Sequence, residues 1–266
     1  MTQQTRLQGA PNFRDLGGME TADGRRIKPH RLLRSGHLHD ITDVDRQRLA
    51  EEFQLKTVID LRTSGEMARK PDAVLPGVVY HHCPIFENQA EGVTRETVTD
   101  IDPDARMVAM AQKMEGQAYE RMRELYKVFF DDHGIKMYRQ FFDLVLNQTD
   151  GAVLWHCTMG KDRCGTAAAL LETALGVPYE TVLADYLLTN ERVLPETEKM
   201  IEKARAITDD EALFEQMRVL DSVYEEFLST VMGIAVERSG SLERFIEVEL
   251  GMTPDKLERL RFLYLE

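Results

Sequence analysis

The segment HCTMGKDRCGT, which begins at His156, places a cysteine, a lysine and an arginine within a few residues of one another. An apolar run at 152–155 precedes it and an alanine-rich run at 167–175 follows it, which predicts a loop between a strand and a helix. Such a loop directs backbone N–H groups and the positive end of the helix dipole toward one point. Because Gly160 permits close approach of the backbone and Arg163 offers a planar fork, we expect a site for a phosphate-sized anion.

Cys157 stands at the base of this loop, where the same field acts on its thiol. A free cysteine has a pKa of about 8.5, and a helix N-terminus with nearby cations can lower it to about 3.5–7.5. A thiolate that faces a phosphate monoester can attack phosphorus in line, form a phosphocysteine intermediate and be released by hydrolysis. The alternative is that Cys157 is a buried cysteine at a strand end and Arg163 an ordinary cation at a helix start.

The string HCTMGKDRCG also resembles the active-site loop of the Cys-dependent protein tyrosine phosphatase superfamily. Its Lys-Asp pair before the arginine is similar to the HCxxGKDR-type bacterial branch, which acts on phosphotyrosine, phosphoserine/threonine and phosphoinositides. Four further segments resemble that branch in order and approximate spacing, at 12–18, 33–36, 58–62 and 185–190. The resemblance covers most of the chain and is weakest at 88–125.

This resemblance implies roles for the loop residues. Cys157 would be the nucleophile and Arg163 the phosphate binder, while backbone N–H groups would come from Thr158, Met159, Gly160, Lys161 and Asp162. The resemblance also implies a helical lid over the active site, which we place at 195–235. The side chain of Lys161 either recognises a second phosphate or is a solvated loop lysine.

Expulsion of the leaving group needs a proton donor, and two aspartates are candidates. Asp60 ends a predicted strand whose C-terminal end would lie at the same sheet edge as the loop, and it resembles the family position with this role. Asp162 lies inside the loop and could protonate the leaving group, activate water or contact a lipid headgroup. Alternatively, Asp60 only pairs with Arg62 or Arg34 to hold the sheet edge, and neither aspartate is the acid.

Cys164 occupies the position after the arginine, where the family pattern usually has Ser or Thr. The family hydroxyl stabilises the cysteine thiolate as it leaves phosphorus, and a thiol is a weaker donor, so we expect slower breakdown of the intermediate unless Thr166 or water substitutes. We hypothesise a reversible Cys157–Cys164 disulfide that switches the enzyme off under oxidation. The alternative is a small residue packed under the loop. Cys83 lies in an apolar strand and is interpreted as core.

The elements that must position these residues predict an α/β fold with a mainly parallel central sheet flanked by helices. Strands are expected at 57–62, 78–82 and 152–155, and an apolar-containing segment at 31–38 follows a short hairpin-like stretch. Helices are expected after Thr42, over 135–147, up to Gly176, and from Pro178, Pro195, Thr208, Ser241 and Thr253. We interpret 1–266 as a single domain with a helical insertion at 88–130 and a helical C-terminal part.

Composition excludes several classes of function. The 266 residues include 33 Lys/Arg and 46 Asp/Glu, a net charge of −13, so the chain is not expected to hold nucleic acid or an anionic membrane by a general field. Residues 1–40 are locally basic, with seven Lys/Arg and four Asp/Glu, and are predicted to lie near the anion site. Three cysteines and the lack of a leader-like or long apolar segment predict a cytoplasmic protein without stable membrane insertion.

The leading hypothesis is a Cys-dependent phosphatase that uses Cys157, Arg163 and Asp60 on phosphotyrosine, with phosphoserine/threonine or phosphoinositides as further substrates. No cofactor or metal is expected, because neighbouring residues of the triplet His-His-Cys at 81–83 would point to opposite faces of a strand. The alternatives are a catalytically silent phosphate- or phosphoinositide-binding module and a rhodanese-like sulfurtransferase. The sequence leaves the physiological substrate and the oligomeric state open.

Overall fold

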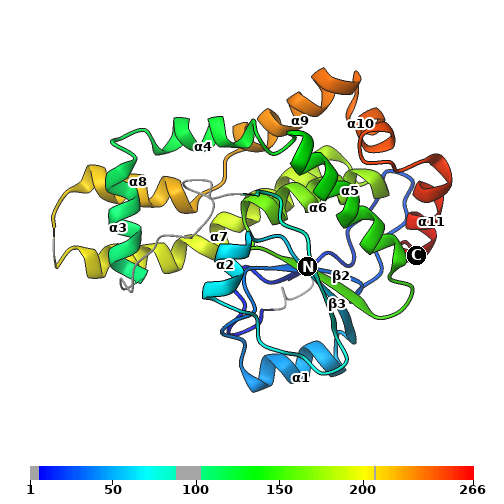
Figure 1. The fold of residues 1–266 in the computed structure, drawn as a ribbon, viewed down its shortest axis with the longest axis horizontal. Helices are drawn as coiled ribbons and strands as arrows, with labels where there is room; N and C mark the ends of the chain where they lie inside the picture. The colour runs from blue at the N-terminus through cyan, green and yellow to red at the C-terminus, as the bar shows by residue number, and fades with distance from the viewer. Residues whose placement is uncertain (1–5, 88–102, 207) are drawn as a thin grey trace.

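The computed structural model describes residues 6–87, 103–206 and 208–266 (Figure 1). The first part of the expected insertion at 88–130 lies outside these residues, and its described part forms α3 (Pro103–Lys113) and α4 (Ala118–Tyr126). The described chain forms one sheet with helices on both faces and a helical C-terminal part, which confirms the expected α/β class.

A five-stranded sheet with the order β1-β2-β5-β3-β4 forms the centre of the fold. β1 is antiparallel to β2, and the other pairs are parallel. Because β3 and β5 pair in parallel with Asp60 opposite His156, their C-terminal ends meet at one edge of the sheet. The strands are β1 (Arg14–Asp15), β2 (Leu32–Ser35), β3 (Leu55–Asp60), β4 (Val79–His82) and β5 (Ala152–His156).

Alternating side chains of the central strands enter two hydrophobic cores, one on each face of the sheet. Val58 and Leu154 belong to the smaller core, to which α1 (Asp43–Glu51) contributes Leu49. Ile59 and Trp155 belong to the larger core, which is built mainly from helices that follow β4. Burial on both faces explains why these strands read as continuous apolar runs in the sequence.

Helices make up most of the described chain after β4. α5 (Asp132–Asn147) and α6 (Asp162–Leu175) flank β5 in sequence and pack against each other. α6 ends where Gly176 adopts a φ of 93°, at the glycine that the sequence marks. The remaining helices are α2 (Ser64–Arg69), α7 (Tyr179–Ala204), α8 (Glu211–Asp221), α9 (Glu225–Ser239), α10 (Leu242–Val248) and α11 (Pro254–Tyr264).

Two of the expected helix starts are wrong. Pro195 lies inside α7, because the buried positions Val193, Thr197 and Ile201 continue through the proline and their packing outweighs its local cost. α8 begins after Asp210, whose side chain accepts the first backbone N–H groups, rather than at Thr208. The starts after Thr42, Ser241 and Thr253 are confirmed, because each of these side chains caps its helix.

Helices α3, α4 and α8 and the C-terminal part of α7 extend to one side of the sheet (Figure 1). α3 packs on α7 and α8, and α4 packs on α8 and α9. Met217 of α8 and Met232 of α9 are buried in the larger core, as expected for core methionines. Among the described residues, no helix has both the length and the apolar character that crossing a bilayer would need.

Candidate active site

The loop between β5 and α6 forms the centre of the candidate site. Cys157 directly follows β5, and Asp162 and Arg163 begin α6, so the predicted strand-loop-helix arrangement is present. Gly160 has a φ of 65°, and a Cβ there would lie 2.5 Å from the carbonyl carbon of Ser35, so this position needs glycine. The turn therefore brings the N-terminus of α6 to the cysteine and makes the expected anion cradle possible.

Side chains of the N-terminal segment and α7 hold the loop by its main chain. The Asn12 amide and the Arg34 guanidinium donate to the Gly160 carbonyl over 2.8 and 2.9 Å. Arg34 and Arg14 both pair with Asp185 of α7, at 2.7 and 3.2 Å. The N-terminal segment therefore lies beside the loop, as expected, but both arginines are buried and paired with a carboxylate.

The Cys157 thiol lies in surroundings that favour the thiolate. Burial alone would raise its pKa, but the hydrogen bond from the Cys164 side chain and the charge of Arg163 lower the pKa from 9.0 to about 5. Cys164 keeps its proton, because burial and the neighbouring Cys157 raise the pKa of its thiol well above the ordinary value. Cys83 has the character of core, since burial raises its pKa to about 12.

Arg163 is held by a carboxylate that the sequence analysis missed. Glu66 of α2 accepts hydrogen bonds from Nη1 over 2.6 Å and from Nη2 over 2.9 Å. The same carboxylate accepts the hydroxyl of Thr158 in the loop. Thr63 and Glu66 form a capping box, and this Thr-x-x-Glu pattern is readable in the sequence but indicates only the start of a helix.

Asp60 lies at the C-terminal end of β3, where the sequence placed it, and Arg62 engages both of its carboxylate oxygens. Arg62 Nε donates to Oδ1 over 2.9 Å, and Nη2 donates to Oδ2 over 2.7 Å. Burial would raise the pKa of Asp60, but the charges of His156 and Arg62 hold it below the ordinary value. These contacts are those of the alternative role, an ion pair at the sheet edge, with Arg62 rather than Arg34 as the partner.

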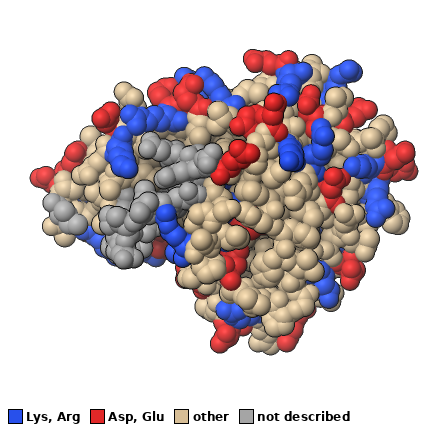
Figure 2. Space-filling model, in the orientation of Figure 1, with Lys and Arg blue, Asp and Glu red and all other residues tan. Residues whose placement is uncertain are grey.

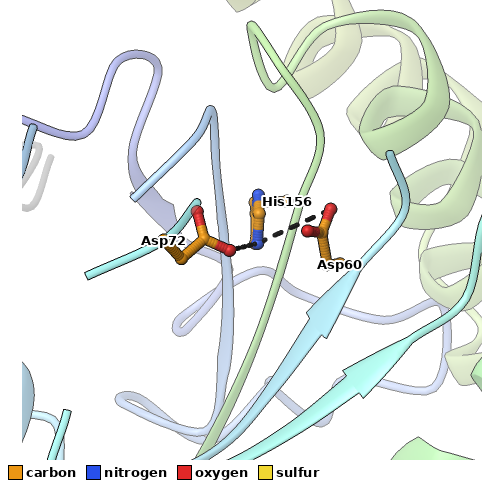
Figure 3. Close-up of side chains that lie close together, drawn as sticks. All are labelled: Asp60, Asp72 and His156. Carbon is orange, nitrogen blue, oxygen red and sulfur yellow. Dashed lines mark ion pairs between the residues drawn. The ribbon is translucent and has the colours of Figure 1, made fainter. Parts of the chain in front are cut away.

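His156 joins Asp60 to a second aspartate, Asp72, that the sequence analysis also missed (Figure 3). His156 Nε2 lies 2.9 Å from Asp72 and 3.8 Å from Asp60, and its Nδ1 donates to the Cys157 carbonyl over 3.2 Å. Burial would lower the pKa of His156, but the two carboxylates raise it. Three such groups resemble a metal site, yet both carboxylates already have cationic partners, Arg62 and His156, so we interpret them as an ion-pair network.

Lys161 and Asp162 contact helices outside the sheet. Lys161 Nζ donates to the carbonyls of Leu220 over 2.5 Å and Ser222 over 3.4 Å, at the end of α8. Lys161 is only 1% exposed, so the interpretation as a solvated loop lysine is wrong. Asp162 accepts a hydrogen bond of 2.7 Å from the hydroxyl of Tyr126, the last residue of α4. Both the insertion and the C-terminal helices therefore reach the loop.

A family model described as "Tyrosine phosphatase family" matches residues 5–266. The chain belongs to the tyrosine phosphatase family. Membership confirms the resemblance carried by the HCTMGKDRCG loop and the enzyme class expected from it, a Cys-dependent hydrolase of phosphate monoesters.

Relatives of known name extend this finding. A protein of Cupriavidus necator named as a tyrosine-protein phosphatase is 34% identical over 185 residues, which cover 68% of this chain and only 61% of the relative. The triple specificity protein phosphatase PtpB of Mycobacterium tuberculosis is 28% identical over 97% of this chain and 98% of its own. Among solved structures, the core catalytic domain of the PP-IP phosphatase SIW14 from S. cerevisiae aligns over 96% of this chain and 98% of that chain, with 11% identity and a TM-score of 0.43.

Proposed function

We propose that this chain hydrolyses phosphate monoesters with Cys157 as the nucleophile and Arg163 as the phosphate binder. The observation that carries the proposal is a buried thiol with a pKa of about 5 beside Arg163 at the N-terminal end of α6. The thiolate attacks phosphorus while the Arg163 fork and the backbone N–H groups of 158–162 bind the phosphoryl oxygens. Water then hydrolyses the phosphocysteine and regenerates the thiolate.

Turnover of p-nitrophenyl phosphate by wild type, Cys157→Ser and Arg163→Lys tests these roles. If the chain is a phosphatase, Cys157→Ser should abolish turnover. Arg163→Lys should also lower turnover, because lysine cannot form the bidentate hydrogen bonds of a guanidinium with the phosphoryl group. Wild type that binds inorganic phosphate without turnover would instead be the silent binding module. Transfer of sulfur from thiosulfate to cyanide would indicate the rhodanese-like alternative, which the family match does not favour.

The general acid is proposed to be one of two aspartates, and the contacts favour Asp162. An acid must hold a proton at working pH, whereas Arg62 and His156 keep the carboxyl of Asp60 ionised although burial opposes this. Asp162 lies in the loop itself, where its carboxylate accepts the Tyr126 hydroxyl and lies 3.5 Å from Lys161 Nζ, a longer ionic contact than that of Asp60 with Arg62. Asp60 in this role stays a prediction.

Phosphotyrosine in proteins is the substrate class that we propose, with phosphoserine/threonine and phosphoinositides as further candidates. Support comes from the similarity over nearly the whole chain to a relative named as a triple specificity protein phosphatase. Lys161 would recognise a second phosphate once it leaves the carbonyls at the end of α8. Assays of phosphate release from phosphotyrosine peptide, phosphoserine peptide and phosphoinositide panels test this role. A loss of activity in Lys161→Ala that is confined to phosphoinositides supports it, and an equal loss on all substrates contradicts it.

A cytoplasmic location of the protein stays a prediction.

Cys164 is proposed as the redox partner of Cys157, because the two buried sulfurs share a hydrogen bond. A peroxide would oxidise the Cys157 thiolate to sulfenic acid and release hydroxide, and the Cys164 thiol would then displace water to form the disulfide. A dithiol reductant returns both thiols. Activity lost to peroxide should return with dithiothreitol in wild type and not in Cys164→Ser, and equal recovery in both would contradict the proposal.

The segment 195–235 is proposed to act as a lid over the site. Cys157 is 2% exposed, so entry of a phosphate ester requires part of the surroundings to move. Lys161 ties the loop to the end of α8, and Asn190 of α7 ties down the turn that follows. The Asn190 amide donates to the Val223 carbonyl over 2.9 Å and accepts the Val223 N–H over 2.8 Å.

A further inference from the structure

Glu66 makes more contacts than the start of a helix requires. Its Oε2 accepts the Thr63 N–H over 3.0 Å, and this bond alone completes the glutamate half of the capping box. The carboxylate also spans Nη1 and Nη2 of Arg163, at 2.6 and 2.9 Å, and accepts the Thr158 hydroxyl. The side chains of Arg163 and Glu66 are 1% and 2% exposed. One buried carboxylate therefore joins α2, the phosphate loop and the arginine.

The Glu66 pair engages the end of the guanidinium formed by its two terminal nitrogens. Two parallel N–H···O bonds fix both the plane and the direction of a guanidinium, which a single bond does not. The ring of Phe86 lies 6.0 Å from the Arg163 Cζ and adds a second surface against the group. A preset plane matters because bidentate binding of a phosphoryl group tolerates little misorientation.

Charge balance gives Glu66 a second effect on the loop. Burial would lower the pKa of Arg163, but the neighbouring Glu66 and Cys157 anions raise it. Burial would raise the pKa of Glu66, but the Arg163 charge holds it at about 2, so the carboxylate stays ionised. Arg163 therefore interacts with two anions, Glu66 and the Cys157 thiolate, and the position of its guanidinium determines how strongly its charge stabilises the thiolate.

We propose that Glu66 is the positioning residue for Arg163, orienting the guanidinium and the Thr158 side of the loop for the phosphoryl group before substrate arrives. The inference rests on the proposed function, which assigns Arg163 as the phosphate ligand. Glu66 does not reach the reacting atoms in this role and acts through the arginine. Its contribution should therefore be visible in phosphate affinity and in the ionisation of Cys157.

The variant Glu66→Gln tests the proposal, with Thr63→Ala as the matched control. Glutamine places an amide N–H group against a guanidinium N–H group, so the two-bond grip is lost. Thr63→Ala removes the cap hydroxyl of α2, together with its 3.4 Å contact to Glu66 Oε2, but keeps the backbone N–H that Glu66 accepts and both contacts of Glu66 with Arg163. Two quantities are measured: the Kd for inorganic phosphate, in proteins that also carry Cys157→Ser, and the pH midpoint of iodoacetamide alkylation of Cys157.

We expect Glu66→Gln to raise the phosphate Kd by about 10-fold or more, because a charge-assisted grip on Arg163 is lost. The alkylation midpoint should move up, since Arg163 no longer stands beside the thiolate. Thr63→Ala should lower Tm by about 2–4 °C and change neither quantity.

Three results would overturn the proposal. The first is a folded Glu66→Gln protein with unchanged Kd and midpoint. The second is tighter phosphate binding with a lower midpoint, which would mean that Glu66 only competes with phosphate for Arg163. The third is failure of both Glu66→Gln and Glu66→Asp to fold, which would make Glu66 a residue needed for folding. If Glu66→Asp folds, its side chain is one methylene shorter, and it should also bind phosphate more weakly than wild type. Absence of p-nitrophenyl phosphate turnover in wild type would remove the proposed function and leave the phosphate-binding comparison valid.

Discussion

At Cys157, two neighbours supply different parts of the field that stabilises the thiolate. Cys164 donates a hydrogen bond to the sulfur, and Arg163 supplies a full positive charge, while burial and Asp162 act in the opposite direction. A thiol thus fills the position where the family pattern usually has a hydroxyl. The ionisation of Cys157, the proposed nucleophile, depends on both neighbours and therefore reports the geometry of the loop.

The alkylation rate of Cys157 should rise with pH through about 5 and then level off, because only the thiolate reacts and burial is outweighed by Cys164 and Arg163. Cys164→Ala should move the midpoint upward, because the hydrogen-bond donor is removed. Cys83→Ala serves as the control, since Cys83 lies in the core and should leave the midpoint in place. A wild-type midpoint near 9, the ordinary value, would contradict the thiolate assignment.

The two aspartates are distinguished by their dependence on the leaving group. Loss of a general acid lowers turnover of phenyl phosphate, a poor leaving group, by about 10²–10⁴-fold and affects p-nitrophenyl phosphate much less. We expect this selective loss in Asp162→Asn, because both oxygens of Asp60 are bonded to Arg62. Rates of both substrates for Asp60→Asn and Asp162→Asn decide the matter, and a selective loss in Asp60→Asn alone would restore the original assignment.

Among the elements of the proposed lid, the turn between α8 and α9 is held by Asn190 of α7. Asn190→Ala removes two hydrogen bonds to Val223, worth about 1–2 kcal/mol in total, so an open form should become about 5–30-fold more populated. Alkylation of Cys157 at pH 7 should accelerate accordingly, with no change in the pH midpoint. Arg218→Ala is the control, because its pair with Glu198 also joins α7 to α8 but is exposed and worth little. Equal rates in wild type and Asn190→Ala would count against the lid.

The connection between α2 and β4 is fastened to the sheet edge by Asp72. This carboxylate accepts the Leu38 N–H over 3.0 Å and lies 3.0 Å from Arg62 and 2.9 Å from His156. Asp72→Asn should lower the free energy of unfolding at pH 7 by about 2–3 kcal/mol, because it removes the carboxylate charge whose pKa folding lowers by nearly two pH units. Burial opposes ionisation of Asp72, but His156 and Arg62 lower its pKa from 3.8 to about 2.

The pH dependence of this effect has a definite sign. A carboxyl whose pKa falls on folding adds stability above its unfolded pKa, and this contribution is lost as pH falls through the folded value. The difference between wild type and Asp72→Asn should thus be full above pH 3.8 and vanish toward pH 2. Urea unfolding of both proteins across this range measures it, and a constant difference would show that Asp72 acts without its charge.

The sequence predicts well those elements whose formation depends on residues close together in the chain. β3 and β5 follow from apolar runs, and the loop after β5 follows from a strand, a glycine and an alanine-rich helix in succession. The helix start predicted at Pro195 is wrong, because the packing of the buried side chains along α7 outweighs the hydrogen bond that the proline removes. Glu66 and Asp72 were missed because their importance lies in partners that are distant in sequence, Arg163 and His156.

At the scale of the whole molecule, the net charge of −13 contrasts with a site for an anion. On the face shown in Figure 2, acidic and basic side chains are interspersed, and neither sign forms a continuous area. The basic residues Arg14 and Arg34 of the N-terminal segment are buried and paired with Asp185. The attraction for an anion therefore comes from Arg163 and the α6 N-terminus over short distances, and the wider field is repulsive.

This arrangement predicts selection by size among anions. Inorganic phosphate should inhibit p-nitrophenyl phosphate turnover competitively, because it fits the loop between β5 and α6. Heparin should not inhibit at a comparable charge concentration, because a polyanion meets the overall charge of −13 without reaching the loop. Inhibition constants at about 50 and 300 mM salt measure the difference, and strong, salt-sensitive inhibition by heparin would reveal a basic surface that contradicts it.

Trp155 gives the molecule a built-in optical reporter. It is the single tryptophan of the chain and lies two residues before Cys157. Its ring is buried against Phe141, and its indole N–H donates to the Cys164 carbonyl over 3.3 Å. All tryptophan emission therefore originates beneath the catalytic loop. We therefore expect intrinsic fluorescence to respond, without any attached label, to phosphate binding and to the proposed phosphocysteine and Cys157–Cys164 disulfide.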